Sequence, residues 1–363
     1  MITIVKTTSE LDALQDRWNE LFELCSTATP YQTFLFNKIT WEVWHEQTDS
    51  LYIICYSQSE GAKIDAIIPC YLNRNRELHL IDYLSDFCEG IIPDESIEKY
   101  AMYREIVNHI LSDSKIKTVC FNNLRAGNRM LAYMYAFGGH SSIKTLTGYS
   151  VIKMTPTPTD KDFVDSIQSC NSSQRKKLRK QFKVASMLAF QEHKYPSEFP
   201  EQDVKSIANY MVDTQMRSKD YFTQRFFDYF RRLYENGMLT VLSHKKDSLP
   251  IAEKMFLTNP KANEYISWIT LYRSKQDNSN LLLASLDMLY KTGVYNFNFA
   301  RGIYAYKLSD FHPNIHILNQ LVIHKSRHAA LKYHLKEAAK QETDYLKQQL
   351  IIRLAHIKHK MHL

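Results

Sequence analysis

Apolar residues in the first third of the chain follow helical spacing at the start and extended spacing afterwards. An amphipathic helix is predicted near the N-terminus by steps of three and four among Leu11, Leu14, Trp18, Leu21 and Phe22. Apolar runs then predict strands over 51–57, 63–72, 77–83 and 117–121, and a helix over 97–112. This order indicates a mixed α/β fold in which neighbouring strands are antiparallel.

The second part of the chain repeats this alternation. Helices are predicted over 172–184, within 203–236 and over 281–291, where Gly293 ends the last one, and strands over 187–191, 238–243, 251–258 and 263–272. Between the two parts, Pro156 and Pro158 end regular structure and stiffen the connection. We therefore expect two domains, at 1–154 and 160–324, joined by a linker at 155–159.

The remaining segment, 325–363, differs in charge from the rest of the chain. Residues 324–363 hold nine Lys or Arg against three acids. Apolar residues recur among them at steps of three and four, at Leu331, Leu335, Ala338, Leu346, Leu350, Leu354, Ile357 and Met361. A basic amphipathic helix is predicted, which packs on its own domain, binds a protein partner or lies on an anionic membrane surface.

Composition narrows the location and the chemistry. Six cysteines lack metal-site or redox spacing, and no run of 18 apolar residues occurs, so we expect a cytoplasmic protein whose tail allows peripheral attachment to the inner membrane face. His356, His359 and His362 have no carboxylate or cysteine companion, so no metal site is expected. With nine glycines in 363 residues, the chain also lacks a glycine-rich phosphate loop.

The most informative segment is 295–307. Tyr295, Phe297 and Phe299 alternate as in a strand, Gly302 permits a sharp turn after Arg301, and Tyr306 and Lys307 follow at the strand's mouth. This segment resembles the Gly-x-x-x-Tyr-Lys signature of the CelD-like acyltransferases, a branch of the GNAT superfamily related to the FemABX peptidyltransferases. Weaker echoes of that family are the Thr29 to Tyr31 segment, the Trp41 and Trp44 pair, Pro69, Asp82 with Tyr83, and the basic segment 171–183.

The resemblance implies two tandem GNAT-like domains and acyl transfer. The expected reaction moves an acyl group from acyl-CoA, a co-substrate and not a bound cofactor, to an amine or hydroxyl of a sugar or cell-envelope precursor. Two alternatives stay open at this point. One is a FemABX-like transferase that uses aminoacyl-tRNA, the only nucleic acid expected as a partner, and the other is a binding protein without catalytic activity.

Lys307 is the first candidate for the reacting centre. The resemblance places it, with Tyr306 beside it, where an ammonium would stabilise the oxyanion of acyl transfer. An attacking amine must also lose a proton, which calls for a base. Glu253, a carboxylate within the apolar strand 251–258, is the candidate, and Asp310 and His312 are further options.

Residues for the acyl donor are predicted at two places. In a GNAT-like half, Arg175 and Arg179 on the basic helix would line the approach to the donor. The family's glycine-containing phosphate loop corresponds here to a segment without glycine, in which Asn278, Ser279 or Asn280 would leave amides free at a helix start. This departure leaves CoA and aminoacyl-tRNA both open as donors.

Overall fold

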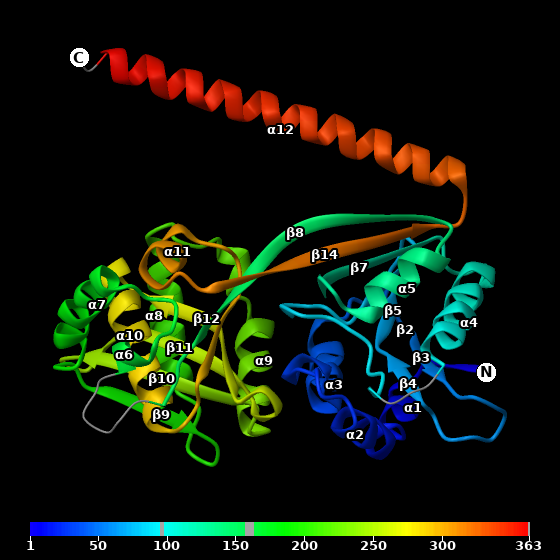
Figure 1. Cartoon of the computed structure of the whole chain (residues 1–363), viewed down its shortest axis with the longest axis horizontal. Coiled ribbons are helices and arrows are strands. Elements are labelled where there is room, and N and C mark those ends of the chain that lie inside the picture. The colour runs from blue at the N-terminus through cyan, green and yellow to red at the C-terminus, as the bar shows by residue number, and fades with distance from the viewer. Residues whose placement is uncertain (95–97, 157–162, 362–363) are drawn as a thin grey trace.

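A computed structural model describes residues 1–94, 98–156 and 163–361, and shows two α/β halves that share one large sheet (Figure 1). The helices of the N-terminal half are α1 (Thr8–Asp12), α2 (Gln15–Glu23), α3 (Phe34–Trp44), α4 (Lys99–Ser112) and α5 (Arg129–Phe137), with the short 3-10 turn η1 (Pro30–Gln32). Its strands are β1 (Ile2–Val5), β2 (Ser50–Leu51), β3 (Ile53–Tyr56), β4 (Ala66–Ile68), β5 (Cys70–Leu72), β6 (Glu77–Leu80) and β7 (Thr118–Arg125).

The C-terminal half has the same mixed character. Its helices are α6 (Phe163–Ser166), α7 (Ser172–Ala185), α8 (Glu201–Asp213), α9 (Gln224–Glu235), α10 (Lys275–Lys291) and α11 (Ala305–Phe311), with η2 (Lys219–Tyr221) and η3 (Pro260–Ala262). Its strands are β9 (Phe190–Lys194), β10 (Leu239–Lys246), β11 (Leu249–Asn259), β12 (Glu264–Tyr272) and β13 (Asn296–Arg301). The mixed α/β class expected from the sequence is confirmed.

Two long strands join the halves, β8 (His140–Lys153) and β14 (Asn314–His324). The large sheet has the order β2-β5-β6-β7-β14-β8-β13-β12-β11-β10-β9, while β1, β3 and β4 form a separate sheet. β8 pairs with β13 at one end, and β14 pairs with both β8 and β7. Figure 1 shows the two strands side by side across the molecule. Part of the segment 160–324, the strand β14, therefore completes the sheet of the first half. A division of the chain into two consecutive domains does not include this exchange.

Two pairs of strands in the described sheets are parallel, β6 with β7 and β12 with β13. The expectation of antiparallel neighbours is wrong at these two places, because a helix crosses between the strands of each pair, α4 in one half and α10 in the other. The predicted strand 63–72 is also divided at Pro69 into β4 and β5, which lie in different sheets. Most of the predicted linker, residues 157–159 of 155–159, lies outside the described residues.

The tail forms one long helix, α12 (Arg327–Met361), which runs outside the two halves (Figure 1). Near its start, the Tyr333 hydroxyl donates to the Gln320 side chain at 3.3 Å, and Lys144 pairs with Glu337. Leu331 and Leu335 are 57% and 64% exposed. The first part of the predicted apolar stripe therefore does not pack into a core, and docking to a partner or a membrane stays a prediction.

Candidate functional site

The signature segment forms the end of β13, a turn and α11. Ala300 has a left-handed φ of 58° and Gly302 a φ of 103°, so the chain leaves the strand through a kink that a β-carbon at position 302 would resist. A β-carbon there would lie 2.8 Å from the Tyr304 ring. This kink exposes the Arg301 side chain and turns Lys307 inward.

Lys307 is almost fully buried, and its ammonium holds the turn together. Nζ donates to the carbonyl oxygens of Phe299 and Gly302, both at 2.9 Å, and lies 4.8 Å from the centre of the Tyr304 ring. Burial lowers the pKa of Lys307 to about 8, while the nearby carboxylate of Asp86 opposes that change. Two of its three N–H donors are thus committed to the strand end and the turn.

Asp86 comes from the other half of the molecule, in the connection between β6 and α4. Its side chain is buried, one oxygen lies 3.4 Å from Nε of Arg301, and the other accepts from the Tyr31 hydroxyl at 3.2 Å. Burial raises the pKa of Asp86 to about 6, and the charges of Arg301 and Lys307 oppose this rise. A carboxyl group that titrates near neutral pH therefore lies beside the predicted signature turn.

Aromatic residues hold this connection in place. Trp268 donates from its indole to the carbonyl of Leu84 at 2.9 Å, and the Tyr31 ring packs edge-to-face on both Phe87 and Trp268. Because Trp268 belongs to β12 and Tyr31 to the first half, these contacts fix Asp86 relative to both halves. Sequence patterns alone did not identify Asp86.

A second buried lysine lies behind the site. Lys254, on β11, donates to the hydroxyls of Thr270 at 2.9 Å and Ser267 at 3.2 Å. Burial lowers the pKa of Lys254 to about 7, and the charge of Lys307 adds to this effect. The site therefore contains two mutually repelling amines whose combined charge can change near neutral pH.

The exposed rim of the site is aromatic. Tyr304 and Tyr306 are 54% and 42% exposed, and their rings are nearly parallel with centres 6.2 Å apart. Asn278 of α10 lies beside the Tyr306 hydroxyl, so two predicted site residues from different elements do meet. Tyr221 lies close to Asp86, Arg301 and Tyr304 on the same rim.

The predicted donor turn is placed differently from the expectation. Helix α10 begins at Lys275, and its N-cap is Ser274, whose hydroxyl accepts from the Asp277 amide at 3.2 Å. Asn278, Ser279 and Asn280 therefore lie inside the helix; for example, the Ser279 hydroxyl donates to the Lys275 carbonyl. The expected helix start was wrong because the apolar pattern begins at Leu281, more than one turn after the cap.

Arg175 and Arg179 of α7 contact the segment that precedes their own helix. Arg175 donates to the Ile167 carbonyl at 3.1 Å, and Arg179 forms an ion pair with Asp165. Lys177 of the same helix pairs with Asp310, one of the alternative bases. Binding of a donor by Arg175 and Arg179 stays a prediction, and both have partners within the protein.

Glu253 does not lie with Lys307. Along β11, Met255 packs in the core under α8 and α9, whereas Ala252 and Phe256 pack in the core with α7 and α10. Since neighbouring strand residues point to opposite faces, Glu253 faces α8 and Lys254 faces the signature helix. The prediction that Glu253 and Lys307 share one centre is wrong for this reason.

Glu253→Gln is expected to stabilise the protein increasingly as pH rises. Burial raises the pKa of Glu253 from 4.5 to about 8, and one of its oxygens has no partner among the described residues. Between these two values the folded state binds more protons than the unfolded state, so stability falls as pH rises, by up to about 5 kcal/mol. Glutamine does not titrate and can still accept from Ser243.

Denaturant unfolding of Glu253→Gln and the unsubstituted protein at about pH 5 and about pH 8 measures this difference. Glu192→Gln, an exposed substitution on the edge strand β9 of the same sheet, is the control and should show no such trend. A gain in stability that is equal at both pH values would contradict the buried, proton-holding state of Glu253.

The N-terminal half repeats the arrangement at the signature turn. β7 contains a left-handed residue, Asn123, with φ of 56°, then ends at Arg125, and a turn through Gly127 leads into α5. Arg125 pairs with Glu89, just as Arg301 approaches Asp86. Both carboxylates belong to the single connection between β6 and α4, so this connection contributes to the corresponding position in each half.

Two further features of the described residues concern metal sites and membrane-spanning helices. Among the side chains that the structure describes, no three His, Cys, Asp or Glu gather as a metal site; those of His356, His359 and His362 lie outside this set. None of the described helices combines the length and apolar character needed to cross a membrane. The six cysteines are free thiols, and most are buried.

No protein-family model and no curated protein sequence matches the chain. In structure it is similar to the C-terminal domain of a protein assigned as a lysylphosphatidylglycerol synthetase from Agrobacterium fabrum, with a TM-score of 0.58 and 12% identity over 89% of this chain and 95% of that one. It is also similar to L-PGS from Bacillus licheniformis, with a TM-score of 0.57 and 14% identity over 88% of this chain and 93% of that one. Its similarity to FemX has a TM-score of 0.55 and 10% identity over 89% of this chain and 97% of that one. The chain therefore shares the overall fold of these proteins, and the expected architecture of two tandem GNAT-like halves is confirmed.

Proposed function

We propose that this protein is a transferase that moves an acyl or aminoacyl group from an activated donor to an amine or hydroxyl acceptor, at the site formed by Asp86, Arg301 and Lys307. The observation that carries this proposal is the meeting of a near-neutral buried carboxyl from one half with the signature turn of the other. Similarity in fold to two proteins with lysylphosphatidylglycerol synthetase or L-PGS names, and to FemX, is consistent with it.

Asp86 acts as the general base in this proposal. When an acceptor amine attacks the donor's carbonyl carbon, the new bond forms as the amine loses a proton, and the carboxylate takes that proton. The leaving group, the thiolate of CoA or the ribose oxygen of tRNA, then departs with the bonding electrons, and the ribose oxygen takes the proton that Asp86 holds. With a pKa of about 6, the Asp86 carboxyl is ionised in most molecules at neutral pH and can still hold a proton transiently during the reaction.

Arg301 and Lys307 serve different steps. The side chain of Arg301 is 43% exposed, so its guanidinium can reach the carbonyl oxygen that becomes negative during attack. Lys307 positions the turn that presents Arg301, and its charge keeps Asp86 more acidic than burial alone would. The direct oxyanion contact predicted for Lys307 would have to use its one remaining N–H.

Two molecules remain candidates for the activated donor. Acyl-CoA is the donor favoured by the CelD-like resemblance, which stays a prediction. Aminoacyl-tRNA is favoured by one structural observation: the first turn of α10, where a CoA pyrophosphate would need positive potential, carries the carboxylate of Asp277. The acceptor, a sugar or a cell-envelope precursor, is likewise proposed from the resemblance.

The test incubates purified protein with acetyl-CoA and longer acyl-CoA esters, or with a mixture of charged tRNAs, in the presence of amino sugars or phospholipid vesicles. Free thiol or uncharged tRNA released only when an acceptor is present would support transfer. Glu105→Gln, an exposed substitution on α4, should behave as the unsubstituted protein. Saturable donor binding without turnover for any acceptor would favour the non-catalytic alternative.

A further inference from the structure

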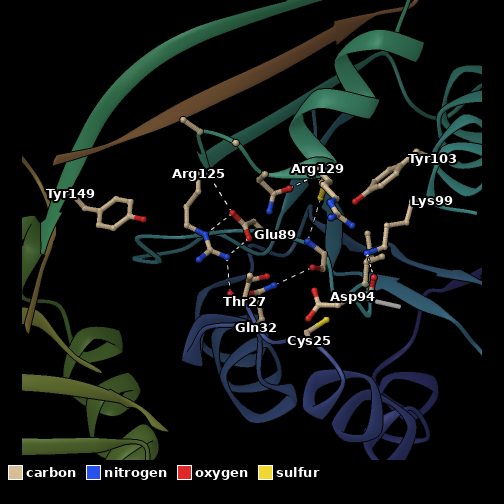
Figure 2. A pocket seen from close by; sticks show the side chains of 16 residues that line it. Cys25, Thr27, Gln32, Glu89, Asp94, Lys99, Tyr103, Arg125, Arg129 and Tyr149 are labelled. Atoms are coloured by element: carbon tan, nitrogen blue, oxygen red, sulfur yellow. Dashed lines mark hydrogen bonds and ion pairs between the residues drawn. The ribbon is translucent and has the colours of Figure 1, made fainter. Parts of the chain in front are cut away.

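A separate pocket lies in the N-terminal half, between the end of β7 and the starts of α4 and α5 (Figure 2). Its volume is about 340 Å³, which is at the lower end of the range for small-molecule sites. Five of its sixteen lining residues are charged: Glu89, Asp94, Lys99, Arg125 and Arg129. The pocket is distinct from the site of Asp86 and Arg301, and a ligand can occupy it whether or not the protein catalyses acyl transfer.

One ion pair in the pocket is complete. Nε of Arg125 donates to Glu89 at 2.8 Å, its terminal nitrogen donates to the second Glu89 oxygen, and the same nitrogen donates to the Thr27 carbonyl at 2.8 Å. Figure 2 shows these contacts as dashed lines on one side of the pocket, with Arg129 and Lys99 on the other. Arg125 and Glu89 neutralise each other, so they build the wall and leave no net charge for a ligand.

Two cations on the opposite side are not neutralised in this way. Lys99 is 8% exposed, and its ammonium donates to a neutral group, the backbone carbonyl of Asp94, at 2.8 Å. The Arg129 guanidinium has no hydrogen bond or ion pair with any described residue. The Asp94 carboxylate accepts from the Ser26 amide at 2.8 Å, which lowers its pKa, and the charges of Lys99 and Arg129 lower that pKa further. One carboxylate thus faces two cations. The lining cations exceed the lining acids by three to two.

A buried hydroxyl lies at the same wall. Tyr103 is 2% exposed and lines the pocket; its hydroxyl makes no hydrogen bond with any part of the described chain, and it is not one of the fully enclosed polar atoms that lack a partner, so it faces the open pocket. Its ring is held by stacking on Tyr133 with centres 5.2 Å apart, so the hydroxyl cannot easily turn elsewhere. A hydroxyl that faces a pocket without a protein partner is free to donate to a ligand there. Tyr103, Lys99 and Arg129 together offer donors of the kind that oxyanions accept.

We propose that this pocket is a second binding site, which takes a small molecule through a phosphate or carboxylate group held by Lys99, Tyr103 and Arg129. Charge-assisted hydrogen bonds from the two cations and a neutral bond from the hydroxyl satisfy three donors at once. The ligand also contacts the connection between β6 and α4, because Glu89, Gly90, Ile92 and Asp94 line the pocket. This connection carries Asp86, so occupancy of the pocket braces the segment that holds the carboxyl group of the other site.

Titration calorimetry with inorganic phosphate and, in a separate arm, with malonate tests the site and distinguishes the two anion classes. Arg129→Gln and Tyr103→Phe should each weaken the preferred anion by about tenfold, since each removes one donor. Lys99→Gln should weaken it at least as much. Lys63→Gln, an exposed lysine of the same half, is the matched control and should bind normally.

Arg301→Gln separates this pocket from the signature turn, and it should leave anion binding unchanged. Loss of binding in Arg301→Gln together with normal binding in Arg129→Gln would overturn the proposal, because the anion would then lie at the other site. So would the absence of saturable binding of both probes up to about 20 mM. Since Arg129 is exposed and Tyr103→Phe removes a single oxygen, neither test depends on the folding of the Lys99 variant.

Discussion

Asp86→Asn is expected to transfer acyl groups about a thousandfold more slowly than the unsubstituted protein. Asparagine has nearly the same shape and can still accept from the Tyr31 hydroxyl, so the connection between β6 and α4 should keep its place. It cannot take a proton from the acceptor. The loss should therefore appear in turnover, with donor affinity little changed.

The pH profile gives this prediction a second readout. In the unsubstituted protein, kcat/KM should fall as the solution becomes more acidic than about pH 6, where Asp86 gains its proton. Residual activity of Asp86→Asn should lack this acid limb. Activity of the variant within about threefold of normal, with the acid limb preserved, would show that another group is the base.

Local patterns predicted the elements that form by short-range rules. The alternating aromatics of 295–299 and the glycine at 302 do form a strand and a turn, because Gly302 needs a positive φ and the side chains pack on a buried sheet. The basic segment after residue 171 does begin a helix, with Asn171 and Gln174 as a capping box. These features depend on residues within one or two turns of each other.

The carboxyl group of the site could not be found in this way. Asp86 meets Arg301 across 215 positions of sequence, and its neighbours give no apolar periodicity that would fix its direction. Glu253 was the expected candidate because an acid in an apolar strand needs a partner. That partner is Ser243, and the strand directs Glu253 to the opposite face of the sheet.

The sheet shared by the two halves could not be predicted from local patterns either, because it also joins residues that are far apart in sequence. β14 follows α11 in sequence, so a linear division assigns it to the second domain, yet the later part of the strand pairs with β7 of the first half. Only the pairing of Val322 with Cys120 and its neighbours reveals this exchange. One signal was present, however: an arginine followed closely by a glycine ends a strand at both Arg125 and Arg301. That repeat marks the strand ends at both sites.

Lys307→Met is expected to lower transfer by about a hundredfold, because the ammonium fixes the turn that presents Arg301 and a misplacement of about 1 Å costs that much. Methionine fills the space but donates to neither Phe299 nor Gly302. The substitution also removes a positive charge that holds the pKa of Asp86 down. The acid limb of kcat/KM should therefore move to higher pH, which a purely structural defect would not cause.

Lys261→Met is the matched control for this experiment. Lys261 also donates to two backbone carbonyls, those of Phe22 and Cys25, and also lies over an aromatic ring, but it is outside the site. It should lower thermal stability without moving the acid limb or reducing turnover. If Lys307→Met and Lys261→Met lose activity and stability to the same extent, with unchanged pH profiles, Lys307 has no role beyond holding its turn. A shifted limb in Lys307→Met alone would show that its charge acts on Asp86, the outcome that the geometry of the signature turn leads us to expect.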